Sequence, residues 1–146
     1  MEKTFTKLSI LICCSILLAG FSTSLFAQGQ RSFVKPIEVG TNDVLFDLPG
    51  EITVNEWDND FVMITATVDL LNASDDILKR LFLAGRYTIQ STDNDDGSLS
   101  VTMPKLEIKV TMRGVTLEEK IRYEVSVPAK TPYEVITPEV ISDGVK

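Results

Sequence analysis

The residues best suited to chemistry in this 146-residue chain form an acidic turn at positions 93–97, with the sequence DNDDG. Ca²⁺ binds carboxylate and carbonyl oxygens, which closely spaced aspartates beside a glycine can supply. Asp93, Asp95 and Asp96 are therefore candidate calcium ligands. Counted from Asp93, however, the glycine is fifth and the twelfth residue is proline, whereas the helix–loop–helix calcium motif has glycine sixth and glutamate twelfth. The alternative is a solvated hairpin turn, so we assign no metal site.

A second polar turn follows the single tryptophan of the chain. Trp57 offers a flat aromatic face, and Asp58 and Asp60 offer oxygens for sugar hydroxyls, so these three residues are candidate glycan ligands. A lone tryptophan beside a turn is also a common packing residue. The sequence leaves both interpretations open.

Catalytic chemistry has little support in this sequence. The chain contains no histidine, which excludes triads built on imidazole and histidine-ligated zinc. Glu118 and Glu119 are adjacent, and neighbouring residues of a strand point to opposite faces, so this pair cannot flank one glycosidic bond. No Gly-x-Ser-x-Gly motif and no phosphate-binding glycine loop occurs. We expect a protein without enzymatic activity and without a cofactor.

The charge balance excludes one class of partner. The chain has 14 Lys and Arg against 21 Asp and Glu, for a formal net charge of −7. Binding to nucleic acid depends on clustered Lys and Arg that neutralise phosphates. We therefore expect no nucleic-acid partner.

The first 27 residues have the pattern of an export signal peptide. Two lysines precede an apolar run over residues 8–20, and Ala27 stands before a polar chain. We expect cleavage after Ala27. The alternative is a retained membrane anchor, although the run is shorter than the ~20 residues that span a bilayer. Cys13 and Cys14 lie inside the run and are interpreted as apolar filler, so the mature chain has no cysteine.

Alternating apolar residues predict a series of β-strands. Residues 51–57 and 61–68 are joined by a short polar turn and predict a β-hairpin. Pro36 restricts the first strand, residues 33–39, to the edge of a sheet because proline has no N–H to donate. The remaining predicted strands cover residues 44–48, 86–92, 98–103, 106–112, 115–127 and 133–136.

One short helix is predicted over residues 74–84. Ser74 is a suitable N-cap, acidic residues follow it in the first turn, and Gly85 supplies the stop. Its apolar face, at helical spacing, consists of Ile77, Leu78, Leu81 and Phe82. We expect this face to pack on the sheet.

The predicted fold class is mainly β: an antiparallel sheet, sandwich-like or forming a solenoid cap, with one short helix. Residues 28–32 are a polar lead-in, residues 33–136 form a single β-rich domain, and residues 137–146 form a flexible tail. Without cysteine, this domain must be held together by its core and its sheet hydrogen bonds.

Two segments resemble a known family. Residues 50–64, GEITVNEWDNDFVMI, and residues 123–128, YEVSVP, are similar to the opening of bacterial adhesin-like envelope proteins of a largely uncharacterised β-solenoid family. Longer members continue past the Val-Pro strand into repeated β-coils, whereas this chain has 18 residues after Pro128. The resemblance therefore implies the opening unit with little or no solenoid, and it brings no catalytic residues.

These observations predict an exported, non-catalytic, adhesin-like or accessory envelope protein. It is expected in the periplasm, on the outer surface or outside the cell, with membrane attachment only if the leader is retained. A partner protein or surface would bind through an exposed edge strand or face. The alternative is a small calcium- or glycan-binding β module, which is favoured if the two polar turns converge on one concave patch.

Overall fold

The structure is a computed structural model that describes residues 28–40 and 42–136. The predicted leader with its cleavage point at Ala27, Cys13 and Cys14, and the predicted tail at residues 137–146 lie outside the described residues.

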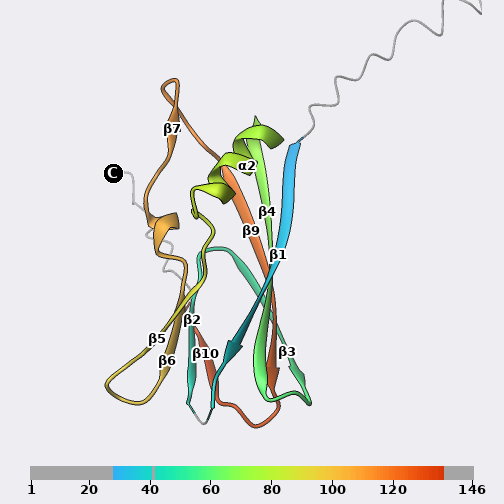
Figure 1. Cartoon of the computed structure of the whole chain (residues 1–146), viewed down its shortest axis with the longest axis vertical. Helices are drawn as coiled ribbons and strands as arrows, with labels where there is room; N and C mark the ends of the chain where they lie inside the picture. The colour runs from blue at the N-terminus through green and yellow to red at the C-terminus, as the bar shows by residue number, and fades with distance from the viewer. Residues whose placement is uncertain (1–27, 41, 137–146) are drawn as a thin grey trace, which may run out of the picture.

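Two four-stranded sheets pack against each other and confirm the mainly β fold class (Figure 1). The long sheet has the order β1 (Gln28–Glu38), β4 (Phe61–Ser74), β9 (Glu119–Pro128), β3 (Glu51–Trp57). The short sheet has the order β10 (Tyr133–Val135), β2 (Val44–Asp47), β6 (Leu99–Thr102), β5 (Gln90–Asp93). The other elements are the helix α2 (Asp75–Leu83), the 3-10 helix η1 (Pro104–Glu107) and the two-stranded hairpin of β7 (Thr111–Met112) and β8 (Val115–Thr116).

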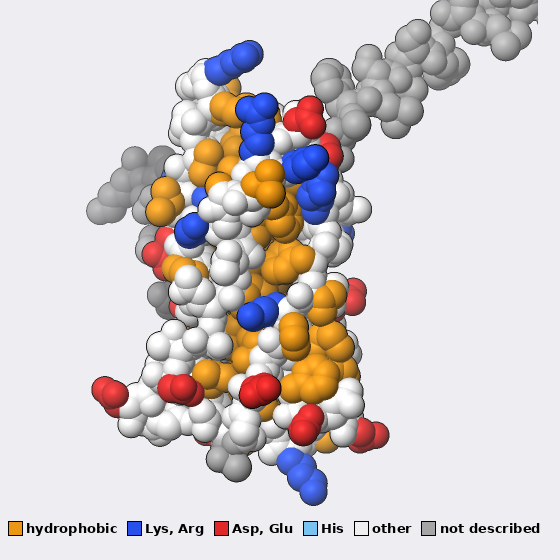
Figure 2. Space-filling view, in the orientation of Figure 1, with side chains coloured by type: hydrophobic (Ala, Val, Ile, Leu, Met, Phe, Trp, Pro, Cys, Tyr) orange, Lys and Arg blue, Asp and Glu red, His pale blue; other side chains and the backbone are white. Residues whose placement is uncertain are grey.

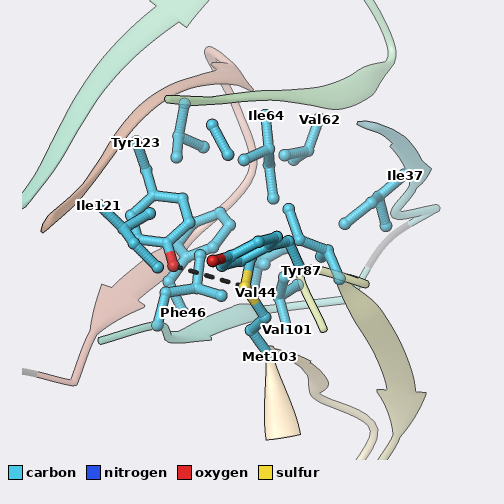
Figure 3. Close-up of a cluster of buried hydrophobic side chains, with 14 of the residues drawn as sticks. Ile37, Val44, Phe46, Val62, Ile64, Tyr87, Val101, Met103, Ile121 and Tyr123 are labelled. Atoms are coloured by element: carbon cyan, nitrogen blue, oxygen red, sulfur yellow. Dashed lines mark hydrogen bonds between the residues drawn. The ribbon is translucent and has the colours of Figure 1, made fainter. Parts of the chain in front are cut away.

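The core lies between the two sheets and follows from the alternation of apolar residues. In β4, Val62, Ile64, Ala66 and Val68 are fully buried, as their spacing predicts. Figure 3 shows side chains of the long sheet, such as Ile64 and Tyr123, facing those of the short sheet, such as Phe46. The Tyr123 hydroxyl lies 3.3 Å from the Pro49 carbonyl oxygen and 3.8 Å from the Met103 sulfur. Its polar group therefore has hydrogen-bond acceptors inside the core.

The predicted hairpin of residues 51–57 and 61–68 is wrong, although both strands exist. β3 pairs in parallel with β9, and β4 pairs antiparallel with the same β9, which therefore lies between them. The turn at residues 58–60 crosses the end of β9 instead of joining hydrogen-bonded neighbours. Two alternating runs that are adjacent in sequence predict two strands but do not show that these strands pair. Here β9, which has four buried apolar residues facing the core, pairs with both β3 and β4 in place of a direct pairing between them.

Residues 28–32 are part of β1, so the prediction of a polar lead-in before the first strand is wrong. Their polar side chains do not prevent strand pairing, because β1 forms an antiparallel ladder with β4 along its whole length. A Cβ on Gly29 would lie 3.0 Å from the Asp75 Cα, so glycine allows the start of α2 to approach this strand. β1 is an edge strand, as Pro36 predicts.

The helix forms close to its predicted limits. Ser74 occupies the N-cap position in an extended conformation, but its side chain makes no capping hydrogen bond. Leu78 is fully buried where α2 packs on β1 and β4 of the long sheet, and the chain leaves the helix at Gly85 with a φ of +69°. The apolar face therefore packs as expected.

The segment after β6 departs most from the predicted strands. Residues 106–112 alternate in sequence but form η1 and an irregular stretch, with only β7 extended. Pro104 opens η1, which takes the chain away from the short sheet. The predicted strand over 115–127 is divided into β8 and β9 by residues 117–118. Residues 108–117 thus form a projecting hairpin, which we call the arm.

Candidate interaction sites

Four loops gather at one end of the sandwich, which we call the loop end. They join β1 to β2, β3 to β4, β5 to β6, and β9 to β10. Hydrogen bonds tie them together: the Asn42 amide donates to Asp93 at 3.2 Å, and the Ala129 N–H donates to the Trp57 carbonyl at 3.1 Å. The loop end therefore brings the two predicted polar turns to the same side of the molecule.

The turn at residues 93–97 uses its polar side chains to hold its own shape. One Asp96 oxygen accepts hydrogen bonds from the Ser98 N–H at 2.9 Å and from the Ser98 hydroxyl at 2.6 Å, and these bonds lower the pKa of Asp96. Asn94 donates to the Ser98 and Ser100 hydroxyls, both at 2.8 Å. Asp95 is exposed. Within the described ranges no three His, Cys, Asp or Glu side chains are grouped to hold a metal ion, and the calcium role of Asp93, Asp95 and Asp96 stays a prediction.

The Trp57 side chain contacts Phe61, at the other end of the turn that follows it. Its indole N–H donates to the Phe61 carbonyl at 2.9 Å, and the two rings meet edge to face with centroids 4.9 Å apart. The indole is half-buried, whereas Asp58 and Asp60 are exposed. The contact closes the connection from β3 to β4 over the end of β9. The glycan role of Trp57, Asp58 and Asp60 stays a prediction.

A pocket of about 350 Å³ lies at the loop end. Asp60 lines it, and so does Asn42, which holds Asp93 of the other turn; Lys130 and Thr131 supply further polar groups. The two turns are therefore linked through the intervening β1–β2 loop, but Asp95, Asp96 and Trp57 do not line this pocket.

A buried charged cluster at the opposite end is absent from the sequence predictions. Arg86 is only 6% exposed, and its guanidinium binds Glu119 with Nε–Oε1 at 2.8 Å and Nη2–Oε2 at 2.6 Å. Its Nη1 donates to the carbonyls of Lys105 at 2.8 Å and Ile108 at 2.9 Å. The Tyr87 hydroxyl donates to Glu119 as well. One arginine thus fastens the chain after α2, the segment around η1 and the start of β9.

The cluster fixes the protonation state of each member. Burial alone would raise the pKa of Glu119, but hydrogen bonds from Arg86 and Tyr87 favour the carboxylate and hold its pKa below the ordinary value. The hydrogen bond to Glu119 raises the pKa of Arg86. Burial, with the bond to Glu119, raises the pKa of the Tyr87 hydroxyl. At neutral pH the cluster is therefore an ion pair with a neutral phenol donating to it.

Glu119 also reaches a surface cavity of about 390 Å³ that is lined by Gly50, Leu106 and Lys120 among others. Its carboxylate already accepts three hydrogen bonds, which suits a structural anion better than a proton-transfer group. Glu118 is exposed, and its backbone N–H binds the Asn72 side chain. No spacing rule links Arg86 to a residue 33 positions away, so sequence reasoning had no signal for this pair.

The outer face of the long sheet is polar along most of its length. Charged pairs stand near the arm, with Arg122–Asp69 at 2.8 Å and Lys120–Glu51 at 3.2 Å. The register then places Thr65, Glu124 and Thr53 side by side across the middle of the face, and aromatic and proline side chains beside the loop end. This face ends at β3, which pairs with β9 on one side and with no other strand of the described chain.

Comparison with known proteins identifies no family for this chain. No protein-family model matches the chain, and no curated protein matches it. One solved structure is similar to it, that of a proposed cell adhesion protein from Clostridium sporogenes ATCC 15579, with 12% sequence identity and a TM-score of 0.39. The match covers 73% of this chain, and the chain spans 45% of that protein. A likeness of this size establishes no family.

Proposed function

We propose that this protein is an exported, non-catalytic module of the cell envelope that binds a partner protein by adding a strand to β3. The observation that carries the proposal is the open edge of β3: among the described strands, its seven residues, Glu51–Trp57, pair on one side only, without proline or register shift. An extended segment from a partner can hydrogen-bond to such an edge, and the side chains then set specificity.

The other edges of the two sheets are less suitable. β1 contains Pro36, which cannot donate a hydrogen bond to an added strand. β5 has four residues and β10 has three, so each offers few backbone groups. β3 is thus the longest edge without an interruption among the described strands.

The side chains of β3 also suit an added strand. Ile52 and Val54 are half-buried and pack against the core, so a new neighbour would remove more of their apolar surface from water. Thr53 and Asn55 are exposed on the other face, where they can pair across strands with polar side chains. The edge therefore offers an apolar row and a polar row to one incoming segment.

A pair of proline substitutions tests this function. Successive residues of a strand direct their N–H groups to opposite sides, so of Thr53→Pro and Glu56→Pro one removes a hydrogen bond to β9 and the other blocks the open edge. Circular dichroism identifies the folded variant. A photoreactive group at Asn55 should then cross-link a partner in the envelope fraction, and the folded proline variant should lose this adduct.

Val34→Pro is the matched control on the opposite edge. It lies two residues from Pro36, so its N–H points the same way, and its side chain is 56% exposed. This control should keep the adduct. Cross-linking that persists in the folded β3 variant would contradict strand addition.

A further inference from the structure

The arm carries most of its apolar side chains on the surface. Ile108 is 65% exposed, Val115 is 58% exposed and Met112 is 38% exposed. The arm projects beyond both sheets at the end opposite the loops (Figure 1). Exposed apolar side chains concentrated on one projection are typical of a docking surface and not of a solvated turn.

The base of the arm is held firmly. Arg86 donates to the Ile108 carbonyl on one side, and the Asn72 side chain donates to the Thr116 carbonyl and accepts from the Glu118 N–H on the other, both at 2.9 Å. The Leu117 N–H donates to the Val110 carbonyl at 2.9 Å, which closes the hairpin. The exposed residues are thus presented on a preorganised element.

The charges on the arm are positive in an acidic protein. Lys109 and Arg113 lie on the arm itself, with Arg113 at the tip in a left-handed conformation (φ 51°). Carboxylates occur at its base, at Glu107 and Glu118. The loop end differs: its loops and the end of β5 carry six aspartates and one lysine. Figure 2 shows the same polarity, with acidic side chains gathered at the lower end and most basic ones at the upper end.

The arm also lies at the end where the described chain begins. Gln28 pairs with Ser74, where α2 starts, and β9 runs from the arm to the loop end over ten residues, about 33 Å at strand spacing. The loop end is therefore a strand length away from both the arm and the start of β1. Among the described residues no helix is long and apolar enough to cross a membrane.

We propose that the arm docks on the anionic surface of a phospholipid bilayer. Ile108, Met112 and Val115 enter the boundary between headgroups and acyl chains, while Lys109 and Arg113 bind lipid phosphates. The acidic loop end then points away from the negatively charged surface, which repels it. This docking is independent of the β3 edge and leaves that edge free.

Tryptophan fluorescence of the full chain tests the docking. Trp57 is the only tryptophan and lies at the loop end, so the wild-type protein reports on the far end. Met112→Trp in a Trp57→Phe background places the reporter at the tip. With phosphatidylglycerol vesicles carrying brominated acyl chains, the tip tryptophan should shift to shorter wavelength and be quenched, while wild-type emission stays unchanged. The charge variants below separate docking by the arm from insertion of the N-terminal apolar run, because the run contains neither Lys109 nor Arg113.

Charge variants sharpen the test. Lys109→Gln and Arg113→Gln should each weaken tip insertion about fivefold, which corresponds to ~1 kcal/mol for each basic residue at an anionic surface. Lys130→Gln, at the loop end, should leave insertion unchanged. The proposal is overturned if tip emission does not respond to anionic vesicles or responds equally to phosphatidylcholine. A shift that appears without vesicles and grows with protein concentration assigns the arm to a second copy of the chain and also overturns it.

Discussion

The two ends of this sandwich use charged side chains in opposite ways. The four ion pairs of the described residues all lie toward the arm, and one of them, Arg86–Glu119, is buried, with side chains 8% and 11% exposed. At the loop end, no aspartate belongs to an ion pair within residues 28–40 and 42–136. Toward the arm, paired charges hold segments of the chain together, whereas at the loop end the carboxylates of the described residues stay outside ion pairs.

The backbone explains why the ends differ. The chain around η1 leaves the carbonyls of Lys105 and Ile108 without strand partners, and the buried guanidinium of Arg86 satisfies both. At the loop end, the turn at residues 93–97 satisfies polar groups within itself, as Asn94 and Asp96 do with Ser98. Their remaining carboxylates stay in water, where they need no counter-ion.

The largest effect is expected from Arg86→Met. The substitution leaves Glu119 buried without its cation and leaves two backbone carbonyls without a donor, which should lower the free energy of unfolding by about 3–5 kcal/mol. Urea unfolding measures this loss. Arg122→Met is the matched control, because it breaks the exposed pair with Asp69 and should cost no more than about 1 kcal/mol. If the two variants lose the same free energy of unfolding, the buried pair contributes no more to stability than the exposed pair, which contradicts the prediction.

A smaller effect is expected from pH. The pKa of Glu119 is lower in the folded protein than its ordinary value of 4.5, so its contribution to stability is present above that pH and is lost as the pH falls below it. The stability of the wild type should therefore decline more steeply below pH 4.5 than that of Glu119→Gln. Parallel pH profiles, measured by urea unfolding at each pH, would show that the carboxylate is not stabilised by the fold.

The smallest effect is expected at the loop end. Asp58→Asn, Asp60→Asn and Asp95→Asn each reduce repulsion among exposed carboxylates and should raise the free energy of unfolding by less than about 0.5 kcal/mol. The gain should shrink as added salt screens these charges. Asp96→Asn is the contrasting variant. Asp96 accepts two hydrogen bonds from Ser98, so this substitution should not raise the free energy of unfolding. A loss for all four variants would indicate a structural role for the whole acidic set.

Much of the fold could be predicted because it depends on local patterns. The alternation of Val62, Ile64, Ala66 and Val68 identifies the central strand and its buried face. The acidic first turn and Gly85 delimit the helix. Pro36 places β1 at an edge. Each of these signals is read within a few residues, and tertiary packing did not override them.

The pairing of strands and the buried cluster could not be predicted, because both depend on residues far apart. β9 joins β3 and β4 although it begins 45 residues after β4 ends. Arg86 meets Glu119 across 33 positions, and in sequence each is an ordinary charged residue of a polar segment. For the site, the sequence identifies the two acidic turns but neither their common end nor the open edge of β3, because both depend on how strands distant in sequence pair.

The insertion of β9 between β3 and β4 has a consequence for how the protein is made. A chain that emerges with its N-terminus first presents β3 and β4 well before residues 119–128 follow. Until then the middle of the long sheet is missing: β4 can pair only with β1, and β3 has no partner strand, although β2, β5 and β6 of the short sheet precede β9 in the chain. Pairing that spans such sequence distances is intrinsically slow. Unpaired strand edges of this kind make an incomplete sheet more prone to aggregation than the finished sandwich.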